Sequence, residues 1–224
     1  MPPPVPSSRL TRGLNTFAAW FSRRWLTVII GMMLVYSLLP FVAPALMKMG
    51  YVGAAQLIYQ PYKLVCHTYA FRSFFLFGDQ VVYARSESGG EFQQATGIAM
   101  TPQGVIEARD FQGNAQVGYK VALCQRDIAI YLSIAFNGIA FGFVRKRAKP
   151  LPWLWFILIG LVPIGLDGFS QLFSQYPLNL IPFRESTWWL RLITGSLFGF
   201  SVAWLVFPLI EETFPGIYKS SQRL

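Results

Sequence analysis

The chain has 224 residues, of which 54% are hydrophobic and only 13% are charged. This composition excludes an ordinary soluble domain and is typical of a protein with several membrane spans. The formal net charge of +9 does not indicate a nucleic-acid partner, because the basic residues lie beside apolar runs and not along one polar face. We therefore expect the lipid bilayer, and no nucleic acid, as a partner.

Residues 1–24 begin with a Pro-rich stretch and continue with four arginines among apolar and aromatic residues. This pattern predicts a short tail followed by an amphipathic helix on the cytoplasmic membrane surface. Residues 25–47 carry no charge and exceed the roughly 20 residues that cross a bilayer, so we expect the first span there. A cleavable signal peptide is the alternative, but this apolar run is longer than the ~7–15 residues of a signal-peptide core.

The next two segments differ sharply in composition. Residues 48–79 combine many aromatic side chains with scattered cations, which is typical of the membrane-water interface. In residues 80–121, short runs of Val, Ile and Tyr are separated by turn signals such as Thr-Pro-Gln-Gly. They predict a small β-rich insert in water.

The remaining apolar runs predict three further spans, at residues 122–144, 151–173 and 187–210. Residues 211–224 are expected to form a second tail. The loop after the second span is rich in basic residues, namely Arg145, Lys146, Arg147 and Lys149. Short loops of this kind stay in the cytoplasm, so both termini are expected there and the insert outside the cytoplasmic (inner) membrane. The predicted fold is an all-α integral membrane protein: a four-transmembrane-helix bundle with an N-terminal interfacial helix and a small extracytoplasmic β-rich insert.

Polar residues on either side of the insert are predicted to converge at the outer ends of the spans. Ionisable groups at the end of a span are costly unless they pair, face the bundle interior or reach water, which makes each a candidate site residue. The candidates are Cys66, His67, Arg72, Cys124, Arg126, Asp127, Asp167, Gln171, Glu185 and Arg191.

Three ion pairs are expected among these groups: Arg191 with Asp167, Arg126 with Glu185, and Arg72 with Asp127. The first follows from depth, because Asp167 and Arg191 both lie toward the outer ends of their spans. Interhelical pairs fix helix register without doing chemistry, so a structural role is favoured for most of these charges. Arg191, Gly195 and Gly199 share one helix face, and this glycine spacing predicts close approach of a neighbouring helix.

The two cysteines allow three interpretations. The favoured one is a disulfide between Cys66 and Cys124, which would close the insert at its base and contribute roughly 3–5 kcal/mol on the chain-entropy model. The second is a metal site formed by Cys66, His67, Cys124 and Asp127, with zinc or another metal ion as cofactor. A thiol redox relay is the third, although neither cysteine lies in a Cys-x-x-Cys motif.

A series of short motifs spans about residues 60 to 200: Cys66-His67, Arg72-Ser73-Phe74-Phe75-Leu76-Phe77-Gly78, Cys124-Gln125-Arg126-Asp127-Ile128-Ala129-Ile130-Tyr131, Pro163, Leu166-Asp167-Gly168, Gln171, Glu185-Ser186, Arg191 and Thr194-Gly195. In order and spacing these motifs resemble a family of small polytopic prokaryotic membrane proteins, the domain of unknown function number 2085. Many members look different in two respects, with a second cysteine where this chain has Asp127 and a much shorter connection in place of the insert. The resemblance implies a fold and a polar constellation, and it carries no established activity.

We therefore expect an integral membrane protein that acts as a binding or accessory protein, with a polar Cys/His/Asp/Arg site at the outer membrane interface. Its candidate binding residues are His67, Arg72, Arg126, Gln171, Glu185 and Arg191. One alternative is a membrane enzyme acting in thiol redox or on an anionic lipid-borne substrate, with Asp127 or Asp167 as general acid or base. A second alternative is a structural subunit of a larger membrane complex, with other subunits as partners. The sequence leaves open whether the protein is an enzyme.

Overall fold

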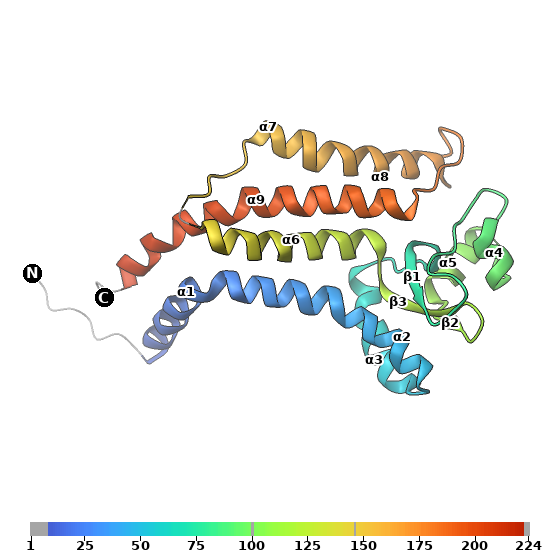
Figure 1. Ribbon diagram of the computed structural model, residues 1–224, viewed down its shortest axis with the longest axis horizontal. Coiled ribbons are helices and arrows are strands. Elements are labelled where there is room, and N and C mark those ends of the chain that lie inside the picture. Colours follow the sequence, from blue (N-terminus) through green and yellow to red (C-terminus); the bar gives the residue numbers. More distant parts are fainter. Residues whose placement is uncertain (1–8, 100, 146, 222–224) are drawn as a thin grey trace, which may run out of the picture.

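The structure, a computed structural model, describes residues 9–99, 101–145 and 147–221. The outer parts of the two predicted tails, residues 1–8 and 222–224, lie outside the described residues, as does Lys146 of the basic loop. Long helices lie side by side, and a smaller unit with a short sheet sits at one end of them (Figure 1). We call this end the insert end, and the opposite end, where the first described helix begins and the last one ends, the termini end.

Within the described residues, four helical segments are long and apolar enough to cross a bilayer: Thr16–Lys48, Gln125–Val144, Trp153–Ser174 and Trp188–Thr213. The predicted bundle of four candidate spans with a small sheet is therefore confirmed. Length and composition assign these helices to the bilayer. Successive spans run in opposite directions between the termini end and the insert end (Figure 1).

The first span consists of two helices, α1 (Arg9–Leu38) and α2 (Val42–Lys48), joined by a short 3-10 turn. Pro40 lies in this turn and lacks the N–H that would continue the α-helical ladder, which explains the interruption. At its other end α1 runs without a break through Trp25. The predicted interfacial helix and the first span are thus one continuous helix.

The other spans are α6 (Gln125–Val144), a composite third helix and α9 (Trp188–Ser221). The third helix comprises α7 (Trp153–Trp155), a π-helical stretch (Phe156–Leu161) and α8 (Val162–Ser174). α6 lies between α1 and α9, with its most extensive contact to α9, and α8 packs on the far side of α9 (Figure 1). α9 is therefore central to the bundle.

Glycines bring α6 and α9 close together, as their spacing predicted. A Cβ atom on Gly195 would lie 2.8 Å from the carbonyl oxygen of Arg126. A Cβ atom on Gly199 would collide with the Ile130 carbonyl and the Ser133 hydroxyl. Small residues at such a crossing let two helix backbones pack directly against each other.

The unit at the insert end extends beyond the predicted insert of residues 80–121, and from here on we call the whole unit the insert. It begins with α3 (Val52–Val65), which follows the first span. Its sheet has the order β1-β3-β2, with β1 (Ser73–Leu76), β2 (Gly113–Asn114) and β3 (Gly118–Cys124) all pairing antiparallel. The middle strand β3 is the one that leads into the bundle. The sheet therefore connects the insert directly to the second span.

Within residues 80–121, two helices were not predicted, α4 (Gly90–Thr96) and α5 (Pro102–Asp110). The Thr-Pro-Gln-Gly sequence was interpreted as a turn between strands. In the structure the Thr101 hydroxyl accepts a hydrogen bond from the N–H of Gly104 at 3.1 Å, and Pro102 is the first helical residue. A threonine cap followed by proline is a typical helix start, so this signal marked α5 and not a hairpin.

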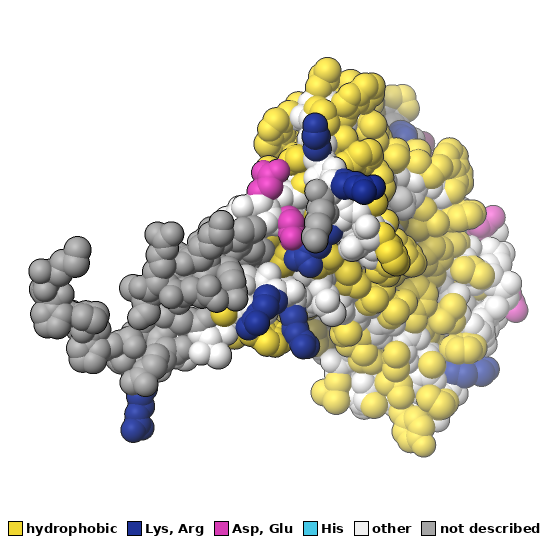
Figure 2. Space-filling model, turned by 60° about the vertical axis from the view of Figure 1, so that its left-hand side comes forward, with side chains coloured by type: hydrophobic (Ala, Val, Ile, Leu, Met, Phe, Trp, Pro, Cys, Tyr) yellow, Lys and Arg dark blue, Asp and Glu magenta, His cyan; other side chains and the backbone are white. Residues whose placement is uncertain are grey.

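The surface of the bundle has two kinds of region. Figure 2 shows hydrophobic side chains over its sides, and Lys and Arg side chains gathered at the termini end. The exposed hydrophobic residues include Met32, Val35, Phe136, Leu158 and Leu166. Apolar sides of this kind are what a lipid bilayer accommodates.

Candidate functional site

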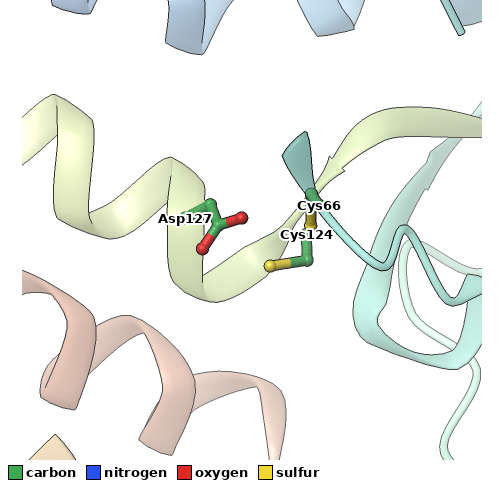
Figure 3. Close-up of side chains that lie close together, drawn as sticks. All are labelled: Cys66, Cys124 and Asp127. Atoms are coloured by element: carbon green, nitrogen blue, oxygen red, sulfur yellow. The ribbon is translucent and has the colours of Figure 1, made fainter. Parts of the chain in front are cut away.

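Two cysteines and one aspartate meet at the insert end of the bundle. Cys66 directly follows α3, Cys124 is the last residue of β3, and Asp127 lies in the first turn of α6. Their ligand atoms, two sulfurs and a carboxylate oxygen, all lie within 4.8 Å of one another (Figure 3). Cys124 was expected inside the second span, but it is extended and precedes the helix, because β3 continues until Gln125 begins α6.

Both cysteines are free thiols in the structure. The hydrogen bond between the two thiols lowers the pKa of Cys66 and raises that of Cys124. Cys66 is therefore the thiol that ionises first, with the Cys124 thiol as its hydrogen-bond donor. The pair expected as a disulfide is present here as two neighbouring thiols.

These residues line a cavity of about 260 Å³ that contains polar side chains from several elements. A second cavity, of about 340 Å³, has part of its lining in common with the first, namely His67, Tyr69, Arg72, Arg126 and Gln171. We call the two cavities together the polar pocket. Arg191 lines the first cavity and Arg85 the second. The polar pocket thus brings together residues from the insert and from three of the four spans.

One buried charge network beside the polar pocket is centred on Asp167, which is 3% exposed. Its carboxylate pairs with Arg126, with Arg184 at 3.2 Å, and with the hydroxyl of Ser186 at 2.9 Å. Gln171, one turn further along α8, donates to the backbone carbonyl of Asp167 at 2.8 Å. The cost of burying this carboxylate is therefore offset by several partners.

A second network is centred on Glu185, whose side chain is 5% exposed. Arg72 holds it with two hydrogen bonds of 2.9 and 3.1 Å, in the two-pronged geometry that guanidinium and carboxylate groups favour. Arg191 also pairs with it, and Arg85 lies at 3.5 Å. Gln175 donates to the same carboxylate at 3.0 Å.

The three expected ion pairs are not formed among the described residues. The structure instead pairs Arg126 with Asp167, and both Arg72 and Arg191 with Glu185. The depth argument placed these groups at the correct end of the bundle. It could not choose partners, because the choice depends on the connection between α8 and α9 that positions Glu185.

Sequence reasoning did not name several polar residues of this region as site candidates, namely Thr68, Arg85, Gln125, Arg184 and Ser186, although Gln125 and Ser186 stand in the motifs that carry the family resemblance. Arg191 donates to the side-chain oxygen of Gln125 at 3.1 Å, and Gln125 is fully buried. Arg184 and Ser186 flank Glu185 in a short connection, and this adjacency was the available signal. Arg85 lies deep in the insert sequence, where no spacing relates it to a span.

Lys120 was also missed, and it supports the loop that follows Cys66. It is 1% exposed and donates to the carbonyl oxygens of Thr68 and Arg109, each at 2.8 Å. Burial lowers the pKa of its amine to about 7. This lysine therefore links two segments of the insert through a buried amine whose charge changes near neutral pH.

Positive charge exceeds negative charge around the polar pocket. Five arginines (Arg72, Arg85, Arg126, Arg184 and Arg191) face three carboxylates (Asp127, Asp167 and Glu185), so two positive charges remain uncompensated. Four buried polar atoms of the pocket also find no hydrogen-bond partner within the described residues: Thr68 Oγ1, Arg85 Nε, Arg126 Nε and Gln171 Oε1. Unsatisfied buried groups are uncommon, and here they line a cavity with room for a ligand.

His67 does not join the cluster of the two thiols and Asp127. Its side chain is exposed, and its ring stacks on that of Tyr69 with centroids 5.7 Å apart. The four-residue metal set expected from the sequence is thus a three-residue set in the structure. His67 remains a lining residue of the polar pocket.

Comparisons with known proteins agree with the membrane assignment and add no activity. A protein of Methanocaldococcus jannaschii, described as uncharacterized protein MJ1492, is 26% identical over 203 residues, which cover 88% of this chain and 97% of the relative. No solved structure matches the chain. The model of the family described as predicted membrane protein (DUF2085) matches residues 115–205. This range includes Cys124, Asp127, Asp167 and Arg191, and it confirms that the chain resembles this family of predicted membrane proteins.

Proposed function

We propose that this protein is a membrane-embedded binding or accessory protein whose polar pocket takes a small anionic ligand carrying a phosphate or similar group. The observation that carries the proposal is the excess of arginines over carboxylates around a cavity with unpartnered buried donors. Guanidinium groups present paired N–H donors that match phosphate and carboxylate oxygens. Arg72 and Arg126 line both cavities and are the central binding residues.

We further propose that the polar pocket faces the outside of a cytoplasmic membrane and that both termini are cytoplasmic. The support is the basic loop after α6, which carries Arg145, Arg147 and Lys149 at the termini end. Short loops rich in Lys and Arg stay in the cytoplasm, so the insert end is outside. The ligand then approaches from the outer side or from the outer lipid headgroups.

A membrane enzyme is the second candidate, and Asp127 is the observation that favours it. This carboxylate lines the first cavity beside both thiols. Asp167 is less suited to act as general acid or base, because two arginines and the Ser186 hydroxyl already hold it. An enzymatic role would therefore centre on Asp127.

Thermal unfolding of the detergent-purified protein tests anion binding. Inorganic phosphate should raise the melting temperature above that in chloride of equal ionic strength, because a ligand that binds the folded state stabilises it. Arg72→Gln should abolish the phosphate effect. Arg145→Gln is the matched control: this arginine also pairs with a glutamate but lies at the termini end, so the phosphate effect should persist.

The source of the anion is distinguished by repeating the measurement in lipid nanodiscs. Stabilisation by phosphatidylglycerol over phosphatidylcholine, lost in Arg72→Gln, would identify a lipid headgroup. Stabilisation by inorganic phosphate in both lipids would identify a free ion. If neither phosphate nor the anionic lipid stabilises the wild-type protein, the proposal is wrong.

A further inference from the structure

Cys66, Cys124 and Asp127 form a compact set of metal-ligand atoms. They come from the end of α3, the end of β3 and the first turn of α6, and their ligand atoms lie within 4.8 Å of one another (Figure 3). In a tetrahedral zinc site with Zn–S bonds of ~2.3 Å, two sulfurs are roughly 3.8 Å apart. Small side-chain rotations therefore suffice to bring all three atoms onto one ion.

We propose that Cys66, Cys124 and Asp127 bind a zinc ion whose fourth coordination position opens into the polar pocket. Two thiolates and a carboxylate suit zinc, and three protein ligands leave one position free for water or a ligand. All three residues line the first cavity, together with Arg72 and Arg126. An anion held by these arginines would therefore lie next to the metal. This consequence rests on the proposed function, but the zinc site itself does not.

The surrounding charges favour the charged, metal-binding form of Cys66, Cys124 and Asp127. Zinc binding replaces the two thiol protons, which are released to solvent, and leaves a site of two thiolates, one carboxylate and Zn²⁺ with a net charge of −1. Arg72, Arg126 and Arg191 line the same cavity and offset this charge. Without a metal, three acidic groups within 4.8 Å of one another would repel each other once ionised.

The cavity also holds a buried polar atom that fits a ligand of the metal. Thr68 is 3% exposed, and its hydroxyl oxygen has no hydrogen-bond partner within the described residues. Thr68 follows Cys66 by two residues and lines the same cavity. A water or anion at the free zinc position would give this hydroxyl a partner.

Elemental analysis of the detergent-purified full chain, after dialysis against zinc and then against buffer, tests the site. We expect about one zinc per chain in the wild type and less than a tenth of that in Cys124→Ala and Asp127→Asn. His67→Gln is the matched control, since His67 lines the cavity but lies outside the ligand cluster, and it should retain zinc. Cobalt(II) in place of zinc should give a thiolate-to-metal charge-transfer absorption that Cys124→Ala lacks.

A measurement on the wild-type chain removes any dependence on whether the variants fold. Zinc should protect both thiols from alkylation, as counted by intact mass. Alkylation of both thiols despite zinc, or a disulfide that resists alkylation without bound metal, would overturn the zinc site. Arg72→Gln should keep its zinc while losing the phosphate effect, so failure of the metal site and failure of anion binding are separable.

Discussion

Trp25 and Phe207 pack edge to face at the termini end of the bundle, with ring centroids 5.6 Å apart, whereas Arg191 and Glu185 are buried as an ion pair at the insert end. Phe141 completes the aromatic cluster at the termini end. Apolar side chains gain little by leaving lipid for protein, so the contact at the termini end rests on aromatic packing together with polar contacts of Glu211, which pairs with Arg145 and accepts a hydrogen bond from the Trp25 ring nitrogen at 3.2 Å. Buried charges must find partners within the protein, so the insert end is specified by pairing.

The largest expected effect is the loss of a buried partner. Glu185→Gln leaves Arg191, which is 3% exposed, without a carboxylate, and should destabilise the protein by about 3–5 kcal/mol. Glu211→Gln is the matched change at the termini end. The side chains of Glu211 and Arg145, which form an ion pair, are each 31% exposed, so the loss of stability should be about 1 kcal/mol or less. Thermal unfolding in detergent compares the two, and equal losses would remove the distinction between the ends.

The second prediction concerns Lys120 and pH. Its pKa is about 7 in the folded protein and 10.5 without burial, so below pH 7 the cost of burying the charge is present in full. As pH rises from 7 to 10, the folded state loses this proton and the unfolded state keeps it. Stability should therefore increase by about 3 kcal/mol over this range, since one pKa unit corresponds to about 1.4 kcal/mol.

Lys120→Met isolates this contribution from the other groups that titrate in the same range. Lys63, Arg109, Asp110 and Cys66 are the charged or titratable groups that act on Lys120 and are unchanged in the variant. The difference in unfolding free energy between wild type and variant should change with pH by the amount above. A difference that stays constant from pH 7 to 10 would contradict the assigned pKa.

The smallest effect is expected where α6 and α9 cross. Gly199→Ala places a methyl group against the Ile130 carbonyl and the Ser133 hydroxyl and should cost about 1–3 kcal/mol. Gly142→Ala, also in the bundle, meets only Leu26 at 3.8 Å and should be neutral or stabilising by about 0.5–1 kcal/mol. Unfolding curves that fail to separate the two variants would mean that the helices do not cross this closely.

The spans could be predicted because apolar length is a local property of the sequence. The unbroken continuation of α1 through Trp25 could not be predicted, because an amphipathic surface helix and a membrane span have the same helical period. In the insert, short apolar runs fit a strand or a buried helix equally well. Thr101 and Pro102 carried the information needed for α5, but the following glycine favoured a turn.

The sequence predicted which residues lie near the polar pocket, but not which of them form ion pairs. Ionisable residues at span ends identified the polar pocket, because few other roles place charges there. Partner choice depended on Arg184, Glu185 and Ser186, which lie in an irregular connection with no periodicity. The approach of Cys66 to Cys124 was predicted, because both cysteines flank the insert on the same side of the membrane, and in the structure α3 and β3 pack into one hydrophobic cluster that brings them together.

Cys124 ends β3 and Gln125 begins α6, so no residue with free torsion angles separates the sheet from the second span. α6 has 20 residues and extends about 30 Å at ~1.5 Å per residue. The sheet of the insert and the basic loop at Arg145 are therefore the two ends of one continuous connection, with no linker between strand and helix.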